Sequence, residues 1–244
     1  MRIRREIINP AGLGTEERRK LLLQLHALNT RIFSGADPSS FGNTVISPPA
    51  SWTRIQVLRD EAGACVGYEA LHRYHFVLLG CERIIFRAQA GILKPYRGQG
   101  ASFPFAYRQA LRYKLCHPWA RVYLFVPVVH PSSFHLLASH CHELHPGPFR
   151  AVPLPMQVLI REMALAFHER LCADASGPAI SLDDWVTIDD DDETAFWQSC
   201  THPDVRFFLQ VNPGYGQGHA LLTLVPVSWK NLLFALLPGL VQTG

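Results

Sequence analysis

Residues 92–102 of this 244-residue chain read Ile92-Leu93-Lys94-Pro95-Tyr96-Arg97-Gly98-Gln99-Gly100-Ala101-Ser102. An apolar, β-like run precedes them and a helical pattern follows, so the glycines fall in a turn between a strand and a helix. Such a turn directs several backbone N–H groups and a helix N-terminus toward one point, where a pyrophosphate can bind. Glycine lets the backbone approach the ligand closely, and Arg97 adds a cation at the rim. The stretch therefore predicts a site for a phosphorylated cofactor.

Other phosphate and nucleophile motifs are absent from the sequence. It contains no G-x-x-x-x-G-K-[ST], no G-x-G-x-x-G with a suitably placed acid, and no G-x-S-x-G. The plainer interpretation of the glycine-rich turn is a tight connecting loop at a helix start. The strand before it, the Lys94–Arg97 lead-in and the helix after it agree with one another, and this agreement favours the cofactor interpretation.

Hydrophobic patterning around this turn predicts a mixed α/β domain with one strand–helix–strand crossover at its centre. Residues 60–63 are expected to form a hairpin turn, and 34–51, rich in Gly, Pro, Ser and Asn, a long loop. Helices are predicted at 15–33, with Thr15 as N-cap, at 101–115 and at 131–139. Strands are predicted at 1–9, 52–59, 64–79, 83–93 and 120–129.

The pattern changes after residue 145. Residues 153–172 predict one long helix, and the acidic run Asp189–Glu193 is expected at a helix N-terminus, where negative charge is favoured. Strands are predicted at 205–211 and 219–227, followed by an apolar tail at 228–241. The tail is too short and too interrupted to span a bilayer. Packing on the domain is the default for it, and the alternatives are a tunnel for a long acyl chain, a dimer contact or contact with a membrane surface.

The glycine-rich turn resembles the pyrophosphate loop of the GNAT superfamily of acyl-CoA N-acyltransferases. Their pattern is [QR]-x-x-G-x-[GA], which residues 97–102 match except for Ser102 at the last position. The predicted element order over 1–140 is also similar. The resemblance implies an α/β fold with a mixed, mostly antiparallel twisted sheet around a central strand–turn–helix cofactor motif. It implies a single domain over 1–244, with 150–204 as a helical insertion and 205–244 as the last strand hairpin plus an apolar C-terminal segment.

The resemblance also implies roles for individual residues. Acetyl-CoA or another acyl-CoA is the expected co-substrate, with Ile92 and Leu93 beside its pantetheine arm and His130 where the family often has an Asn that contacts the cofactor. The strand 120–129 is expected to splay from the strand ending at Leu93 and to leave a slot for the thioester. The residues expected around the pyrophosphate are Arg97, Gly98, Gln99, Gly100, Ala101 and Ser102.

Several positions depart from the family pattern. Leu137 stands where the family often has a Tyr as general acid, and Leu cannot donate a proton. Residues 141–142 are Cys-His in place of Gly-Phe, and 87–90 lack a Glu frequent on the fourth strand. Glu69 and His72 are the candidate catalytic bases; because they are three residues apart, they point to opposite faces, and only one can face the slot. The alternative for Glu69 is a surface carboxylate paired with an Arg.

The charge distribution and the cysteine content limit the ligands and the cellular compartment that we expect. Residues 1–150 hold 19 Lys and Arg against 9 Asp and Glu, and residues 151–244 hold 4 against 11. A basic first part suits an anionic ligand, and the alternative is a solvated face plus an acidic loop. Nucleic acid is disfavoured because the basic run at 18–20 has no interleaved aromatic residues. Six cysteines without a C-x-x-C pair, and no visible secretory signal, favour reduced thiols and a cytoplasmic location.

No metal site is expected from the sequence. A His-rich segment shows no recognised ligand spacing; its members are His130, His135, His140, Cys141, His142 and His145.

Three functions fit these observations. The first is transfer of an acetyl or other acyl group from acyl-CoA to a primary amine on a small molecule or a peptide. The second is transfer of a longer chain from CoA or an acyl carrier protein, with the apolar C-terminal part shaping the chain pocket. The third is a non-catalytic CoA-binding module, motivated by Leu137. A homodimer is compatible with each of them.

Overall fold

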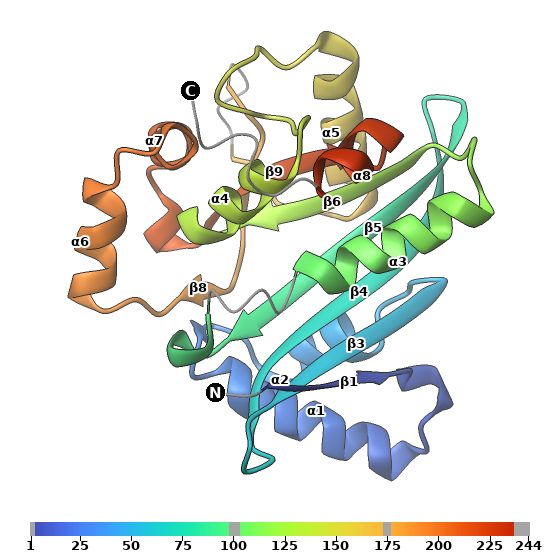
Figure 1. Ribbon diagram of the computed structural model, residues 1–244, viewed down its shortest axis with the longest axis vertical. Coiled ribbons are helices and arrows are strands. Elements are labelled where there is room, and N and C mark those ends of the chain that lie inside the picture. The colour runs from blue at the N-terminus through green and yellow to red at the C-terminus, as the bar shows by residue number, and fades with distance from the viewer. Residues whose placement is uncertain (1–2, 98–102, 173–176, 237–244) are drawn as a thin grey trace.

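The computed structural model describes residues 3–97, 103–172 and 177–236, and its framework is a seven-stranded sheet (Figure 1). β5 and β6 run parallel, and the other neighbouring pairs of this sheet are antiparallel. The mixed, mostly antiparallel sheet that the sequence predicts is therefore confirmed. In sheet order the strands are β1 (Arg4–Ile8), β3 (Trp52–Arg59), β4 (Cys65–Leu78), β5 (Cys81–Ile92), β6 (Val122–Val128), β9 (His219–Pro226) and β7 (Ile180–Leu182).

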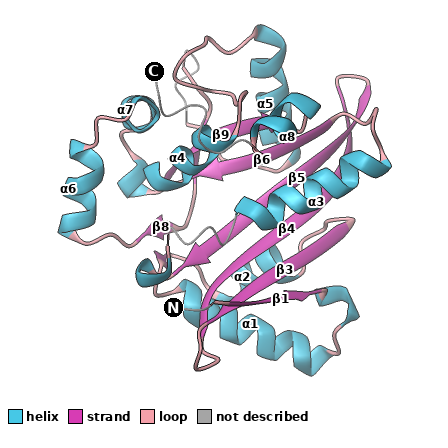
Figure 2. Cartoon of the chain, viewed as in Figure 1, coloured by secondary structure: helices cyan, strands magenta, loops and turns pink. Residues whose placement is uncertain are grey.

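Helices cover both faces of this sheet (Figure 2). Tyr68 and Ala70 of β4 pack with Leu25 of α1 and Phe41 of α2, whereas Leu71 packs with Phe105 of α3 on the opposite face. Two short strands, β2 (Phe33–Ser34) and β8 (Val186–Thr187), pair separately. The helices are α1 (Thr15–Asn29), α2 (Pro38–Phe41), α3 (Phe103–Cys116), α4 (Pro131–His140), α5 (Leu154–Ala166), α6 (Asp191–Ser199), α7 (Pro203–Val211) and α8 (Trp229–Phe234).

The two central strands, β5 and β6, separate along their length. Within these described strands, parallel pairing covers Ile84–Phe86 of β5 and Val122–Leu124 of β6. β5 continues to Ile92, while β6 continues to Val128 paired with β9 alone. The strands therefore splay after their first few residues, as the resemblance implies, and leave an opening in the sheet.

The N-terminal helices differ from the prediction. Gly14, not Thr15, is the N-cap of α1, because the Glu17 side chain accepts a hydrogen bond from the Gly14 N–H at 3.0 Å. α1 also ends at Asn29, short of residue 33. The expected loop at 34–51 contains α2 and a π-helical turn at Gly42–Ile46, because Asp37 caps α2 and the segment buries apolar side chains.

The C-terminal part differs more. α5 ends at Ala166, and the segment 150–204 holds β7 and β8 as well as helices, so the expectation of a helical insertion is only partly correct. The predicted strand 205–211 is wrong, because these residues form most of α7. Val205 and Phe208 are buried at helical spacing, and Phe208 packs on Phe134 of α4 with ring centroids 5.6 Å apart. β7 occupies the edge of β9 instead, so the expected last hairpin does not form.

The apolar tail packs on the domain as far as it is described. α8 lies against α3, where the Tyr107 hydroxyl donates a hydrogen bond to the Leu232 carbonyl at 2.9 Å. Leu232 is buried in the cluster around Phe86 and Phe105. Among the described helices, none is long and apolar enough to cross a membrane.

Candidate functional site

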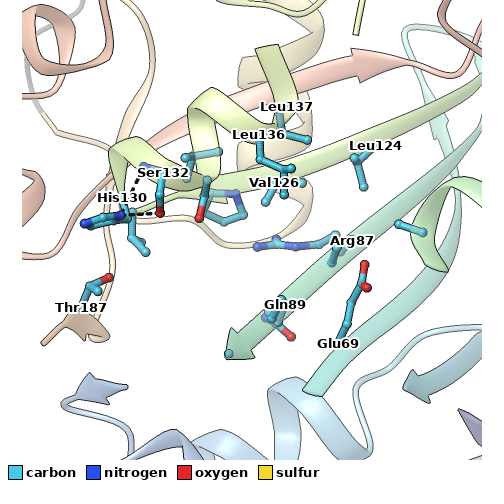
Figure 3. A pocket seen from close by; sticks show the side chains of 18 of the residues that line it. Glu69, Arg87, Gln89, Leu124, Val126, His130, Ser132, Leu136, Leu137 and Thr187 are labelled. Carbon is cyan, nitrogen blue, oxygen red and sulfur yellow. Dashed lines mark hydrogen bonds between the residues drawn. The ribbon is translucent and has the colours of Figure 1, made fainter. Parts of the chain in front are cut away.

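The opening between β5 and β6 leads into a cavity of about 1310 Å³. Residues from both faces of the sheet line it, including Ala106 of α3 on one face and Phe33 on the other. Figure 3 shows side chains of β4 and β5 on one side of the cavity, with Leu136 and Leu137 of α4 across from them. We call this cavity the cleft.

The edge of β5 that faces the cleft belongs to Ala88 and Ala90. The Ile84 N–H donates to the Arg121 carbonyl at 2.9 Å, so the even-numbered residues of β5 turn their backbone groups toward β6. At Ala88 and Ala90 β6 has already moved away, and both small side chains line the cleft. An extended ligand can add to such an edge as a strand would. Ala88 and Ala90 were not singled out from the sequence. The signal that could have found them is a pair of alanines two residues apart in a predicted strand.

The Ile92 carbonyl and both backbone groups of Leu93 have hydrogen-bond partners within the protein. The Ile92 carbonyl accepts a hydrogen bond from Arg97 Nε at 3.1 Å, although Ile92 does line the cleft. The Leu93 N–H donates to the Val66 carbonyl at 3.0 Å, and its side chain packs beside Leu58. The expectation that Ile92 and Leu93 lie beside a pantetheine arm stays a prediction, while the backbone that faces the cleft farther back along β5 belongs to Ala88 and Ala90.

The residues expected around the pyrophosphate divide into two groups. Arg97 lies at the rim of the cleft. Gly98, Gln99, Gly100, Ala101 and Ser102 lie outside the described residues, so their role stays a prediction.

Lys94 and Arg97, the two cations before the glycine-rich turn, form ion pairs with acidic residues at the start of α6. Arg97 Nη1 lies 2.5 Å from Glu193 Oε1, and Lys94 Nζ lies 2.5 Å from Asp190 Oδ2. The Asp190 side chain also caps α6 by accepting from the Glu193 N–H, as predicted for this run. The hydrogen bond to Lys94 and the Glu193 N–H lower the pKa of Asp190, which keeps it ionised. The positive charge that the turn would offer to a phosphate is thus partly neutralised.

His130 is buried at the N-cap of α4 and lines the cleft. Its Nδ1 accepts a hydrogen bond from the Ser132 N–H at 3.2 Å, so in the neutral ring the proton is on Nε2. Nε2 lies 2.9 Å from Asp189 Oδ2. Because both ring nitrogens have partners, contact between His130 and a cofactor stays a prediction.

Glu69 is 4% exposed and lines the cleft from the α3 face of β4. The interpretation as a surface carboxylate is therefore wrong. Burial raises the pKa of this carboxyl well above its usual range, against the opposing effects of the Arg108 charge and the Ala106 backbone N–H. Its Oε2 atom is buried without a hydrogen-bond partner in the described structure. Such a carboxyl can hold or accept a proton at the cleft wall.

His72 points to the opposite face, as predicted from the spacing. Its ring is 1% exposed and hydrogen bonds through Nδ1 with the Thr53 hydroxyl at 3.0 Å. Burial lowers the pKa of His72 to about 4, so the ring is neutral at physiological pH. Because His72 does not line the cleft, Glu69 is the candidate base of the two that faces it.

The α4 wall of the cleft offers little acid–base chemistry. Leu137 lines the cleft where the resemblance places a Tyr. Cys141 lies nearby on the chain and lines it too, but burial raises the pKa of its thiol to about 12. Neither residue can protonate a leaving thiolate efficiently at neutral pH.

Acidic residues gather on the other side of the cleft. Arg87 Nη1 pairs with Glu169 Oε1 at 2.7 Å and lies over the Phe167 ring. Asp184 pairs with Arg170, whereas Asp183 accepts a hydrogen bond from the Trp185 N–H at 3.0 Å. Burial raises the pKa of Asp183. These carboxylates all line the cleft, and the sequence contained no motif that placed them there.

No protein-family model and no curated protein matches the sequence. Solved structures do match. Arabidopsis thaliana NAA60 in complex with acetyl-CoA is 16% identical, with 62% of this chain and 91% of that chain covered and a TM-score of 0.38. The similarity to this structure is low, and it assigns no role to this chain.

Two further structures are similar to a comparable degree. The ribosomal-protein-alanine N-acetyltransferase from Brucella melitensis is 14% identical over 56% of this chain and 88% of that chain, with a TM-score of 0.35. Tetrahymena GCN5 is 10% identical over 62% and 84%, with a TM-score of 0.40. At these identities and TM-scores, nothing is carried over from these proteins to this chain.

We expect Glu69→Gln to stabilise the protein at neutral pH. Above its ordinary pKa of about 4.3, Glu69 ionises freely in the unfolded chain, whereas burial opposes ionisation in the folded state. Glu69 therefore lowers the free energy of unfolding at pH 7, and a neutral isostere removes that cost. In a chain of this size each kcal/mol gained raises Tm by about 2–4 °C.

The measurement is Tm against pH for both proteins. The two curves should converge below about pH 4, where the carboxyl is protonated in both states. A Tm difference that is the same at pH 3.5 and pH 7 would contradict the assignment of a buried, proton-holding carboxyl.

Proposed function

We propose that this protein is an acyl-CoA-dependent N-acyltransferase that acts in the cleft. The observation that carries the proposal is the open edge of β5 at Ala88 and Ala90, which faces a cavity beside the start of α3. An amide-bearing arm can add to this edge as an extra strand. A helix N-terminus preceded by the glycine-rich turn suits the pyrophosphate of the same donor.

The cleft allows the two substrates to approach from opposite faces of the sheet. The donor enters on the α3 side, and the acceptor enters where Glu169, Asp183 and Asp184 lie. Arg87 and Arg170 pair with Glu169 and Asp184, so Asp183 is the carboxylate of the three with no ion pair among the described residues. It favours an acceptor that arrives as a cation, which suits a primary amine, on a small molecule or a peptide. The neutral amine then attacks the thioester carbon, the C–N bond forms, and the C–S bond breaks to release the thiolate. Holding the two reacting atoms together supplies much of the rate.

Proton transfer is assigned to Glu69 and water. Once ionised, Glu69 accepts the proton that the attacking amine loses, directly or through a water molecule. Leu137 has no proton to donate to the leaving group. A thiolate whose conjugate acid has a pKa of about 8.5 can leave unprotonated and take its proton from water.

Turnover tests this proposal directly. The protein is incubated with acetyl-CoA and with longer acyl-CoAs, each with a panel of primary amines, and mass spectrometry follows amide and free CoA. We expect one amide formed for each CoA released, with kcat rising with pH through the raised pKa of Glu69. Glu69→Gln should lower kcat about a hundredfold or more and remove that pH limb. Binding of CoA without turnover by any acceptor would favour the non-catalytic module.

A longer acyl chain is the second candidate, favoured by the size and lining of the cleft. Leu136 and Leu137 of α4, and Leu232 and Ala235 of the C-terminal segment, add apolar surface to a cavity of about 1310 Å³. An acetyl methyl group would leave much of this surface uncovered. An acyl carrier protein is an alternative carrier for such a chain, since the basic first part of the sequence suits an acidic protein.

We expect Glu193→Gln to tighten CoA binding up to about tenfold. The substitution removes the carboxylate that holds the Arg97 guanidinium and frees this cation for a phosphate. Asp191→Asn is the matched control, because Asp191 is an exposed residue of the same helix and the substitution removes the same charge. Calorimetric titration with CoA gives both dissociation constants. Equal effects of the two variants would assign the change to net charge, and weaker binding in Glu193→Gln would contradict a cofactor role for Arg97.

We expect affinity to rise from acetyl-CoA to octanoyl-CoA, with each buried CH₂ contributing up to about 0.8 kcal/mol. Ala235→Trp should flatten this series, because the indole would fill the part of the cleft that Ala235 lines. Leu236→Trp is the control, since Leu236 is exposed. Dissociation constants across the chain-length series check the expectation. A flat series in the wild-type protein would leave acetyl transfer as the function.

A further inference from the structure

A second cluster of reactive side chains joins α4 to α7. His135 of α4 and His202, which precedes α7, both direct Nδ1 at the carboxylate of Asp204. His135 Nδ1 lies 2.9 Å from Asp204 Oδ2, and His202 Nδ1 lies 2.7 Å from Asp204 Oδ1. The ligand atoms of the three residues all lie within 4.8 Å of one another. One carboxylate and two imidazoles thus converge on a single point.

The carboxylate of this cluster is buried, whereas one of its imidazoles is half exposed. Asp204 is 3% exposed, and its hydrogen-bond partners in the described structure are the two imidazoles. A neutral imidazole compensates a buried carboxylate charge only in part. The His202 side chain is half exposed, so one side of the cluster is open to solvent. A cation could enter there and keep a water molecule as a further ligand.

We propose that His135, His202 and Asp204 bind one divalent transition-metal cation, for which zinc is the best match. Imidazole nitrogen and carboxylate oxygen are ordinary zinc ligands, and three protein ligands plus water complete a tetrahedron. Tetrahedral ligands about 2.0–2.1 Å from zinc stand about 3.3–3.4 Å apart. The two imidazole–carboxylate separations of 2.9 and 2.7 Å would widen by roughly 0.4–0.7 Å on binding, and neutral rings would carry their protons on Nε2.

The site would fasten α7 to α4, which forms one wall of the cleft. Only one of its ligands belongs to the His-rich segment of the sequence, and Asp204 follows it by 69 residues. Local spacing therefore could not reveal the cluster. The plainer role for the same contacts is a hydrogen-bonded brace between the two helices, which would require no ion.

Metal titration separates these roles. Protein dialysed against a chelator is titrated with Zn²⁺ in competition with a chromophoric chelator, and with Co²⁺ while the visible spectrum is recorded. We expect one tightly bound equivalent and a Co²⁺ spectrum of nitrogen and oxygen ligation. His202→Gln and Asp204→Asn should each weaken binding at least tenfold, the loss that follows even when a group that only orients a ligand is removed. Because His202 is half exposed, its variant keeps the test valid if Asp204→Asn fails to fold.

His75→Gln is the matched control, because His75 is an exposed histidine on β4 outside the cluster. It should bind Zn²⁺ as the wild-type protein does. Unchanged affinity in His202→Gln, or no equivalent bound by the wild-type protein, would overturn the proposal. A thiolate-to-cobalt band in the near ultraviolet would also overturn it, because the ion would then be bound by one of the free cysteines.

Discussion

The hydrogen bonding of β6 determines where the sheet opens. After Leu124 this strand pairs with β9 alone, so among the described strands none lies beside the β5 edge at Ala88 and Ala90. Backbone groups within a sheet are costly to leave unsatisfied in a dry interior, and an edge of this kind needs either water or a ligand chain. The cavity, its small-residue wall and the two approaches to it follow from that one divergence. The covering helices α3 and α4 then decide how apolar the donor side is.

The acidic run at 189–193 places carboxylates against the basic residues at the rim of the cleft. Asp189, Asp190 and Glu193 form ion pairs or hydrogen bonds with His130, Lys94 and Arg97, so residues from the second half of the chain contact the segment that precedes the glycine-rich turn and the start of α4. The charge asymmetry in the sequence has this contact as one physical basis. A phosphorylated donor would compete with these carboxylates for Arg97, while the backbone N–H groups of the turn would still be attracted to phosphate. Binding strength would then reflect a balance between two anions.

Much of the framework was predictable because it rests on local signals. The strand periods, the 60–63 turn and the order of elements to residue 140 needed no long-range information, and the splay followed from the family resemblance. Residues 205–211 were misassigned because a short apolar run fits either period, and packing of Phe208 on α4 decided for a helix. The residues of the site were harder to predict from the sequence. The burial of Glu69, the ion pair between Arg97 and Glu193 and the exclusion of His72 from the cleft all depend on tertiary contacts between segments far apart in sequence.

Hydrogen–deuterium exchange with and without an acyl-CoA shows whether the donor occupies the open edge of β5. If the donor adds to the open edge of β5, backbone amides at 87–92 and at 126–130 should gain protection, while those of β1 and β3 should not change. The same pattern should weaken when the acyl-CoA is diluted below its dissociation constant. Saturating acyl-CoA that leaves 87–92 unprotected, or that protects only segments outside the cleft, would contradict the account.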